Sequence, residues 1–355
     1  MTTPLPAGIR AVDIETSRLK VHVLEREDSS PDAEPVLLVH GNVSSSLFFV
    51  DLINALPDRF RPIAPDLRGY GGTDPLPIDA SRGLQDWADD ILGLADALGL
   101  QTFHLLGWSM GGGVAMQVLL QAPERIRTLM LQAPVSPYGF GGTRGENGEL
   151  LSSDGAGSGG GCANPRFVEL LAAGDTGTED QTSPRNVLRA FYVAPGAQLE
   201  REDLYVESML TTRTGEDHYP GDHTPSSSWP GVAPGKRGVL NTMAPTVCQL
   251  DGIVDVDPKP PILWIRGDQD AIVSNQSMFD LAQLGAIGAV PGWPGADECP
   301  PQPMITQTRA VLDRYSANGG QYTEVVLEGV GHSPHIEAPE GYTEVLVKHL
   351  SSASG

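Results

Sequence analysis

LLGWSMGGGVAM, residues Leu105–Met116, is the stretch that decides the fold. Ser109 lies between Gly107 and Gly111 in the pattern Gly-x-Ser-x-Gly, with a strand-like apolar run before it and a helix-like run after it. A serine between a strand and a helix stands on a sharp, strained turn, and the glycines remove side chains that would collide there. The first N–H groups of the helix point toward the same hydroxyl. The stretch therefore predicts a nucleophilic serine at the carboxyl end of a buried strand.

A second stretch, AGSGG at residues 156–160, nearly matches the same pattern. No apolar strand precedes it, and no helix follows it directly. Ser158 is therefore expected to be an ordinary loop serine, because the pattern signals a nucleophile only between a strand and a helix.

Strands and helices alternate on both sides of Ser109. Residues 9–15 and 18–25 alternate polar and apolar side chains, which predicts a half-exposed antiparallel pair. Continuous apolar runs predict buried parallel strands, and apolar stripes with helical spacing predict amphipathic helices. The expected later strands are residues 36–40, 61–66, 103–108, 126–134, 262–267 and 323–329, and the expected helices are 84–98, 114–120, 306–316 and 341–350. The order predicts an α/β fold with a mostly parallel twisted sheet flanked by helices.

This alternation stops between residues 137 and 260, which predicts a mostly helical cap inserted into a core formed by residues 1–136 and 261–355. Asn164-Pro165 and Ser183-Pro184 are typical helix starts, with a capping side chain followed by proline. A third helix is expected over residues 199–212. The glycine-rich residues 139–161 and residues 226–230 are expected to be irregular lid elements near the entrance of a site.

Composition narrows the possible partners. The 355 residues carry a net charge of −22, which disfavours nucleic acid and anionic membranes as partners. No apolar run approaches the roughly 18 residues of a membrane span, and no signal segment opens the chain, so we expect a cytoplasmic protein. The three cysteines are far apart and lack metal-binding spacing, so neither a disulfide framework nor a metal site is expected.

A serine nucleophile needs a histidine base, and His332 is the best candidate. It follows the expected strand 323–329 in the stretch GVGHSPHIEAPE, at the same edge of the sheet as Ser109. His335 is its main rival, although that residue is expected to start the next segment or to line the entrance. The remaining histidines are expected to be structural, exposed or pocket-lining; they are His22, His40, His104, His218, His223 and His349.

The orienting carboxylate is expected just after another strand. The stretch ILWIRGDQDAIVS offers Asp268 and Asp270. Asp270 is preferred because one residue must first close the turn, and Asp268 stays the alternative. The strand 126–134 ends without an acid. The order Ser109, Asp270, His332 is the one expected on an α/β-hydrolase sheet.

An oxyanion hole needs two N–H donors, and the first is expected to be the backbone of Met110. The second is expected in HGNVSSSLFF, residues 40–49, from the backbone of Asn42 or Val43 or from the Asn42 side-chain amide. The alternative for Asn42 is a turn residue that binds its own loop. Apolar pocket lining is expected from a set of five residues, for which a core position is the alternative: Val43, Phe48, Trp108, Phe191 and Tyr192.

Five motifs resemble those of the α/β-hydrolase superfamily; they are VLLVHGN, DLRGYGGTD, GWSMGGG, RGDQD and GHSPHIEAPE. The resemblance covers roughly residues 10–135 and 260–352. HGN is similar to the haloalkane dehalogenases, but those enzymes and the soluble epoxide hydrolases have an aspartate nucleophile where this chain has Ser109. A serine at this position implies acyl chemistry, or the related cleavage of carbon–carbon bonds in 1,5-diketones.

The expected function is therefore that of a serine hydrolase acting on a small-molecule carboxylic ester or lactone, without a metal or an organic cofactor. Amide or iminopeptidase activity, carbon–carbon hydrolysis and cofactor-free perhydrolysis are the alternatives within enzymes. A ligand receptor that keeps the fold without turnover is an alternative of another class. The triad residues do not separate these functions, because the cap and loops select the substrate.

Overall fold

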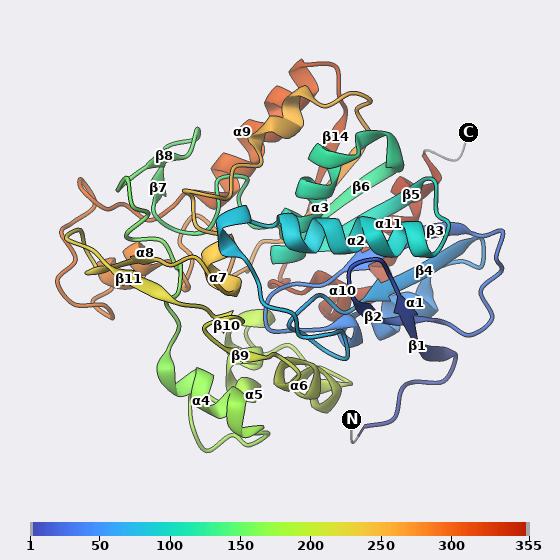
Figure 1. Ribbon diagram of the computed structural model, residues 1–355, viewed down its shortest axis with the longest axis horizontal. Coiled ribbons are helices and arrows are strands. Elements are labelled where there is room, and N and C mark those ends of the chain that lie inside the picture. The colour runs from blue at the N-terminus through green and yellow to red at the C-terminus, as the bar shows by residue number, and fades with distance from the viewer. Residues whose placement is uncertain (1–2, 353–355) are drawn as a thin grey trace.

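An eight-stranded sheet lies at the centre of the computed structural model, which describes residues 3–352 (Figure 1). The strand order is β1-β2-β4-β3-β5-β6-β13-β14. The strands are β1 (Ile9–Glu15), β2 (Lys20–Arg26), β3 (Glu34–Val39), β4 (Phe60–Pro65), β5 (Phe103–Trp108), β6 (Ile126–Gln132), β13 (Ile262–Gly267) and β14 (Tyr322–Leu327). Strand β2 pairs antiparallel with β1 and β4, and the other neighbours pair in parallel. The predicted fold class is confirmed.

Helices cover both faces of this sheet. The main ones are α1 (Val50–Ala55), α2 (Gln85–Ala97), α3 (Met110–Gln121), α9 (Met304–Ala317) and α11 (Pro339–Ser351). Helices α2 and α3 pack together on one face, and α1 and α11 contact each other on the opposite face (Figure 1). The helix after Ser109 begins at Met110, so the three glycines before the predicted helical residues 114–120 belong to its first turn.

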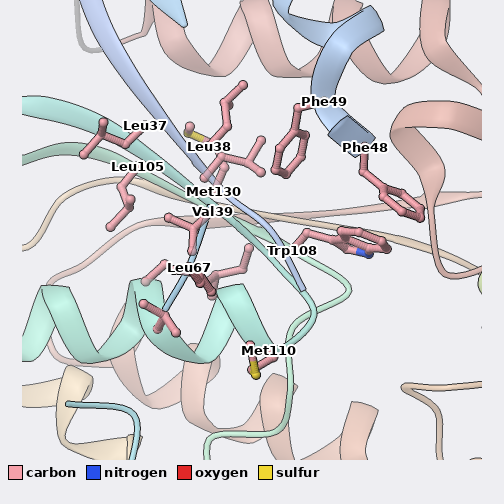
Figure 2. Close-up of a cluster of buried hydrophobic side chains, with 14 of the residues drawn as sticks. Leu37, Leu38, Val39, Phe48, Phe49, Leu67, Leu105, Trp108, Met110 and Met130 are labelled. Atoms are coloured by element: carbon pink, nitrogen blue, oxygen red, sulfur yellow. The ribbon is translucent and has the colours of Figure 1, made fainter. Parts of the chain in front are cut away.

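The middle strands are buried on both faces, as a parallel sheet between two helical layers requires. Every residue of β5 is buried, from Phe103 to the fully enclosed Trp108 at its carboxyl end. Figure 2 shows side chains such as Leu37, Leu105 and Met130 gathered along these strands, between α3 on one side and helices on the other. The strand that leads to Ser109 is therefore anchored throughout its length.

Residues between β6 and β13 form a long insertion with little regular structure. Its helices are α4 (Pro165–Ala173), α5 (Pro184–Val187), the π-helical turn η4 (Leu188–Tyr192), α6 (Glu202–Leu210), α7 (Val239–Thr242) and the 3-10 helix η5 (Asp251–Asp255). Three two-stranded sheets connect them, formed by β7 (Thr143–Arg144) with β8 (Glu149–Leu150), β9 (Thr214–Gly215) with β10 (Tyr219–Pro220), and β11 (His223–Pro225) with β12 (Val232–Pro234). The insertion is thus more irregular than expected from its helical pieces, because glycine and proline interrupt both of its ends.

The helix starts in this insertion follow the predicted capping chemistry. The Asn164 side chain accepts the N–H of Arg166, and the Ser183 hydroxyl accepts the N–H of Asn186. The glycine-rich residues 139–161 pack against the chain rather than project from it, since the Gly141 N–H donates to Gln302 Oε1 at 2.5 Å.

Within residues 3–352, no helix is both long and apolar enough to cross a membrane. The same part of the chain contains no group of three His, Cys, Asp or Glu side chains placed to hold a metal ion. Cys162, Cys248 and Cys299 are free thiols, and the latter two are buried.

Candidate active site

Ser109 has the strained backbone expected of a serine on a strand–helix turn. Its φ is 59° and its ψ is −121°, a combination of backbone angles that residues other than glycine rarely adopt. Three backbone hydrogen bonds hold it there: its N–H donates to Gln132 O at 2.9 Å, and its carbonyl accepts N–H groups from Gly112 and Val135. The turn is therefore fixed by the end of β6, by the segment that follows β6, and by the helix that begins at the turn.

The glycines around Ser109 allow this close packing. A Cβ on Gly107 would lie 2.1 Å from Gly111 O, and one on Gly111 would lie 2.4 Å from the backbone oxygens of Val39 and His40. Gly112 faces the proline that follows β6, with only 2.5 Å of space for a Cβ. These contacts are mostly with backbone, which cannot move aside.

His332 lies beside this turn and is paired with Asp270. His332 Nδ1 is 2.8 Å from Asp270 Oδ2, and both residues are buried, with 1% and 8% of their surface exposed. The Trp108 Nε1–H donates to His332 O at 2.9 Å, which ties the histidine loop to the end of β5. Because Nδ1 is paired with Asp270, Nε2 is the ring nitrogen of His332 that is left to act as a base.

The two candidate acids have different roles in their loop. Asp270 Oδ1 accepts the N–H groups of Ile272 and Val273, so the second oxygen is oriented toward His332. Asp268 Oδ1 instead accepts the N–H of Gly329 at 2.7 Å and links the turn to the end of β14. The structure therefore pairs Asp270, and not Asp268, with the histidine.

The Ser109 side chain is partly exposed, and the hydrogen bonds found within residues 3–352 include none from its hydroxyl. A Cβ on Gly41 would lie 2.9 Å from Ser109 Cβ, so the loop after β3 borders the serine directly. Hydrogen bonds between a nucleophile and its base commonly form or tighten only once substrate is bound.

His335 is enclosed in the core. Its Nδ1 accepts from Gln132 Nε2 at 2.6 Å, and Tyr342 donates to the same Gln132 side chain. Its ring packs against Trp108 with 5.0 Å between the ring centroids. Burial lowers the pKa of His335 to about 3, so the ring is neutral and fills space beneath Trp108.

Three further histidines are buried in the core and have structural positions. His40 Nε2 accepts the N–H of Leu67, and the His104 ring contacts the Thr128 hydroxyl at 2.8 Å. Burial lowers the pKa of both. His349 on α11 is also largely buried, and burial lowers its pKa to about 4. It is therefore not one of the exposed histidines.

The loop after β3 is held by hydrogen bonds to the side chain of Asn42. Asn42 Oδ1 accepts Tyr70 O–H at 2.7 Å and Val43 N–H at 2.9 Å. Val43, which has a φ of 46°, therefore uses its N–H within the turn and is not available as the second donor. The backbone N–H and the side-chain amide of Asn42 remain as the candidate donors on this loop.

The five expected pocket residues divide into two groups. Tyr192 lies edge-on to the His332 ring at 6.1 Å, and Trp108 lies 5.6 Å from the same ring. Phe48 is fully buried, and its ring lies beside Trp108 with 5.0 Å between the ring centroids (Figure 2). Val43 is buried in the turn, and Phe191 packs instead on Phe279 at 5.0 Å. Phe48 is enclosed in the core, whereas Phe191 is partly exposed, so pocket lining by Phe191 stays a prediction.

Three residues at the site were not singled out in the sequence. Tyr70 holds Asn42, while Tyr219 lies close enough to Tyr70 and Tyr192 to raise the pKa of both phenols, in addition to burial. Glu337 binds the backbone beside His332. Tyr70 and Glu337 stand inside the motifs DLRGYGGTD and GHSPHIEAPE, which is the signal that could have found them.

Comparison with known sequences supports this reading of the fold. Residues 34–150 match the family model described as alpha/beta hydrolase fold. Haloalkane dehalogenase 2 of Mycobacterium tuberculosis is 34% identical over 117 residues, which cover 33% of this chain and 39% of that protein. Carboxylesterase YbfK of Bacillus subtilis is 32% identical over 134 residues, covering 38% and 44%. The chain thus spans about two fifths of the length of the curated relatives it matches.

Solved structures resemble the whole chain. The crystal structure of carboxylesterase CesB (YbfK) from Bacillus subtilis aligns with a TM-score of 0.59 and 17% identity, covering 98% of this chain and 93% of that one. The naproxen esterase of the same organism aligns with a TM-score of 0.57 and 16% identity, covering 97% and 92%. Fold and site together define an α/β protein with a serine on a strand–helix turn. The chain has the α/β-hydrolase fold.

Proposed function

We propose that the protein is a serine hydrolase that cleaves a carboxylic ester or lactone through an acyl-enzyme on Ser109. One observation carries the proposal: a serine in a strained backbone conformation directly follows β5, and the backbone of a buried His332–Asp270 pair is hydrogen-bonded to the adjacent Trp108. Strained residues of this kind are retained where a reactive group must be presented. A carboxylesterase and a 2-hydroxymuconate semialdehyde hydrolase are among the relatives that match part of the chain, which agrees with this chemistry.

The proposed reaction needs only groups of the chain, substrate and water. Ser109 Oγ attacks the carbonyl carbon while His332 Nε2 takes its proton, and Asp270 accepts the Nδ1–H and stabilises the charged ring. His332 then gives the proton to the departing alkoxide. A water molecule, deprotonated by His332, attacks the acyl-enzyme and releases the carboxylic acid and the free serine.

The oxyanion of each tetrahedral intermediate is proposed to bind the N–H of Met110 and a donor on Asn42. Tyr70 and Val43 support this role, because both donate to Asn42 Oδ1 and so turn the amide nitrogen to the other side. We further propose that residues 137–260 act as a cap. This assignment rests on Tyr192, which comes from the insertion and lies against His332.

Replacement of Ser109 tests the proposal. Ser109→Ala is expected to abolish labelling by a fluorophosphonate probe and to lower ester hydrolysis roughly 10⁴-fold or more, because the nucleophile is lost. Ser158→Ala is the matched control, since it makes the same change in the similar sequence AGSGG and should keep both activities. Undiminished hydrolysis by Ser109→Ala would reject the proposal.

A substrate panel separates the related functions that share this site. Esters of p-nitrophenol, lactones, aminoacyl amides and 1,5-diketones should be compared by kcat/KM, with ester or lactone the best substrate. Preference for an amide or a diketone would reassign the enzyme within the same chemistry. Stoichiometric labelling without product release would favour a receptor.

A further inference from the structure

Glu337 binds the backbone on both sides of His332. This residue ends α10 (Pro334–Glu337), five residues after the histidine. Its carboxylate accepts the N–H of Gly331 at 2.9 Å and the N–H of Ser333 at 3.1 Å. Together with the Trp108 bond to His332 O, these contacts fix the main chain of the histidine on three sides.

The same carboxylate also binds the insertion. Ala194 N–H donates to Glu337 Oε2 at 2.7 Å, the shortest of its hydrogen bonds. The two segments touch at this point, because a Cβ on Gly331 would lie 2.5 Å from Ala194 N and 2.6 Å from the carbonyl carbon of Val193. One side chain therefore joins a segment of the insertion to the histidine loop.

The joined segment reaches the loop after β3 as well. Tyr192 precedes Ala194 by two residues, and its hydroxyl donates to Asn42 O at 2.9 Å. Its ring lies edge-on to His332. Residues 192–194 thus bridge the loop that carries Asn42 and the loop that carries His332.

Glu337 is held by N–H groups rather than by a cation. Within residues 3–352, no lysine or arginine forms an ion pair with it, and its side chain is largely buried. Burial raises the pKa of Glu337, while the three N–H groups and His332 act in the opposite direction. A buried carboxylate without a cation depends on all of its donors, so the segments that supply them are held together.

We propose that Glu337 is a positioning residue that couples the insertion segment 192–194 to the His332 loop. Its kinetic consequences rest on the proposed hydrolase function, whereas the coupling of the two segments does not. A neutral amide in place of the carboxylate offers one acceptor oxygen instead of two, so at least one of the three hydrogen bonds is lost. The remaining bonds lose the negative charge that strengthens them, so both segments are held less tightly.

Hydrogen exchange and kinetics test this coupling. Glu337→Gln is nearly isosteric, and Glu340→Gln is the matched control because it makes the same change on an exposed side chain three residues later. In Glu337→Gln, peptides covering residues 191–196 and 329–335 should both exchange faster than in wild type. The kcat for ester hydrolysis should fall roughly 10- to 100-fold, with a smaller change in KM, because Glu337 orients His332 without touching substrate.

Two outcomes would overturn the proposal. One is faster exchange in residues 329–335 alone, or in neither segment; the other is a kcat close to that of Glu340→Gln. If Glu337→Gln does not fold, Glu337→Asp decides, because it keeps the charge one methylene short of its donors and should still expose both segments. If Ser109→Ala retains activity, the hydrolase proposal fails while the exchange result still tests the coupling.

Discussion

At the scale of the residue, Ser109 is held in its strained conformation by its backbone and not by its side chain. Its N–H and its carbonyl oxygen make all three of the hydrogen bonds that fix the turn. Strain of this kind costs about 1–3 kcal/mol, which the surrounding structure must offset. Alanine at this position keeps the same backbone groups, so Ser109→Ala removes the hydroxyl and leaves the turn in place. The variant therefore tests the role of the hydroxyl without a change in the backbone of the turn.

The space at Gly107 leads to a prediction about stability. Gly107→Ala should lower the free energy of unfolding by about 1–3 kcal/mol or more, because the new Cβ would lie 2.1 Å from Gly111 O. Gly341→Ala is the matched control, since nothing lies within 4 Å of its Cβ position near the start of α11. That variant should be neutral or gain about 0.5–1 kcal/mol. Urea unfolding measures both, and equal stability of the two variants would contradict the packing seen around Ser109.

The candidate site shows which residues a sequence can reveal. Asp270 follows from local reasoning, because a strand end, a turn and a carboxylate are all visible in one stretch, and the structure pairs it with His332. Its catalytic role stays a prediction. Glu337 could not be assigned a role, because its partners are backbone N–H groups, one of them 143 residues away. The buried position of Phe48 was equally hidden, since its aromatic neighbours Trp108 and Tyr205 come from distant segments.

At the scale of the element, hydrophobic pattern predicted the long pieces and missed the short ones. Every predicted strand of the large sheet is present, because buried parallel strands leave continuous apolar runs. Helices α1 and α10 have six and four residues, too few for a clear period. Short helices of this length depend on tertiary contacts, and α10 ends at the carboxylate that binds three backbone N–H groups.

Helix α8 (Leu281–Ala286) carries a buried cap that should make stability depend on pH. Asp280 accepts the N–H of Ala282 at 3.0 Å and that of Gln302 at 2.7 Å, and burial raises its pKa from 3.8 to about 6. The native state therefore keeps a proton that the unfolded chain releases between about pH 4 and 6. This stabilisation is complete below about pH 4 and is lost as the pH rises through 6.

The effect on the free energy of unfolding is on the order of 3 kcal/mol, because the pKa of Asp280 rises from 3.8 to about 6 on folding. Urea unfolding of wild type and Asp280→Asn should be compared from pH 4 to 7.5, because the asparagine cannot titrate. The stability of wild type relative to the variant should fall across this range. Asp297→Asn is the control, an exposed aspartate in the loop between α8 and α9. A wild-type advantage that grows with pH would reverse the sign and reject the buried cap.

At the scale of the whole molecule, the insertion and the core share a polar network. Gln302, in the loop before α9, donates to Gly139 O and accepts the N–H of Gly141 at the beginning of the insertion. Cys248, near the end of the insertion, contacts the backbone of Gly139. The two ends of the insertion therefore meet the core at one place, and we expect them to unfold with it.

The cysteines can test this expectation, because Cys248 belongs to the insertion and Cys299 to the loop that carries Gln302. Burial raises the pKa of these thiols to about 12 and about 11. A thiol reacts as its thiolate, so in the native protein at pH 8 both should resist alkylation by iodoacetamide. Cys162 is less buried and should react first.

Alkylation in increasing urea, followed by peptide mass spectrometry, then reports where the chain opens. If insertion and core form one cooperative unit, Cys248 and Cys299 become reactive over the same range of urea, since both are exposed by the same unfolding event. If residues 137–260 unfold by themselves, Cys248 and Cys162 are both alkylated at a lower urea concentration than Cys299. That second result would contradict the shared network, because Gln302 cannot hold Gly139 and Gly141 while the insertion around them is open.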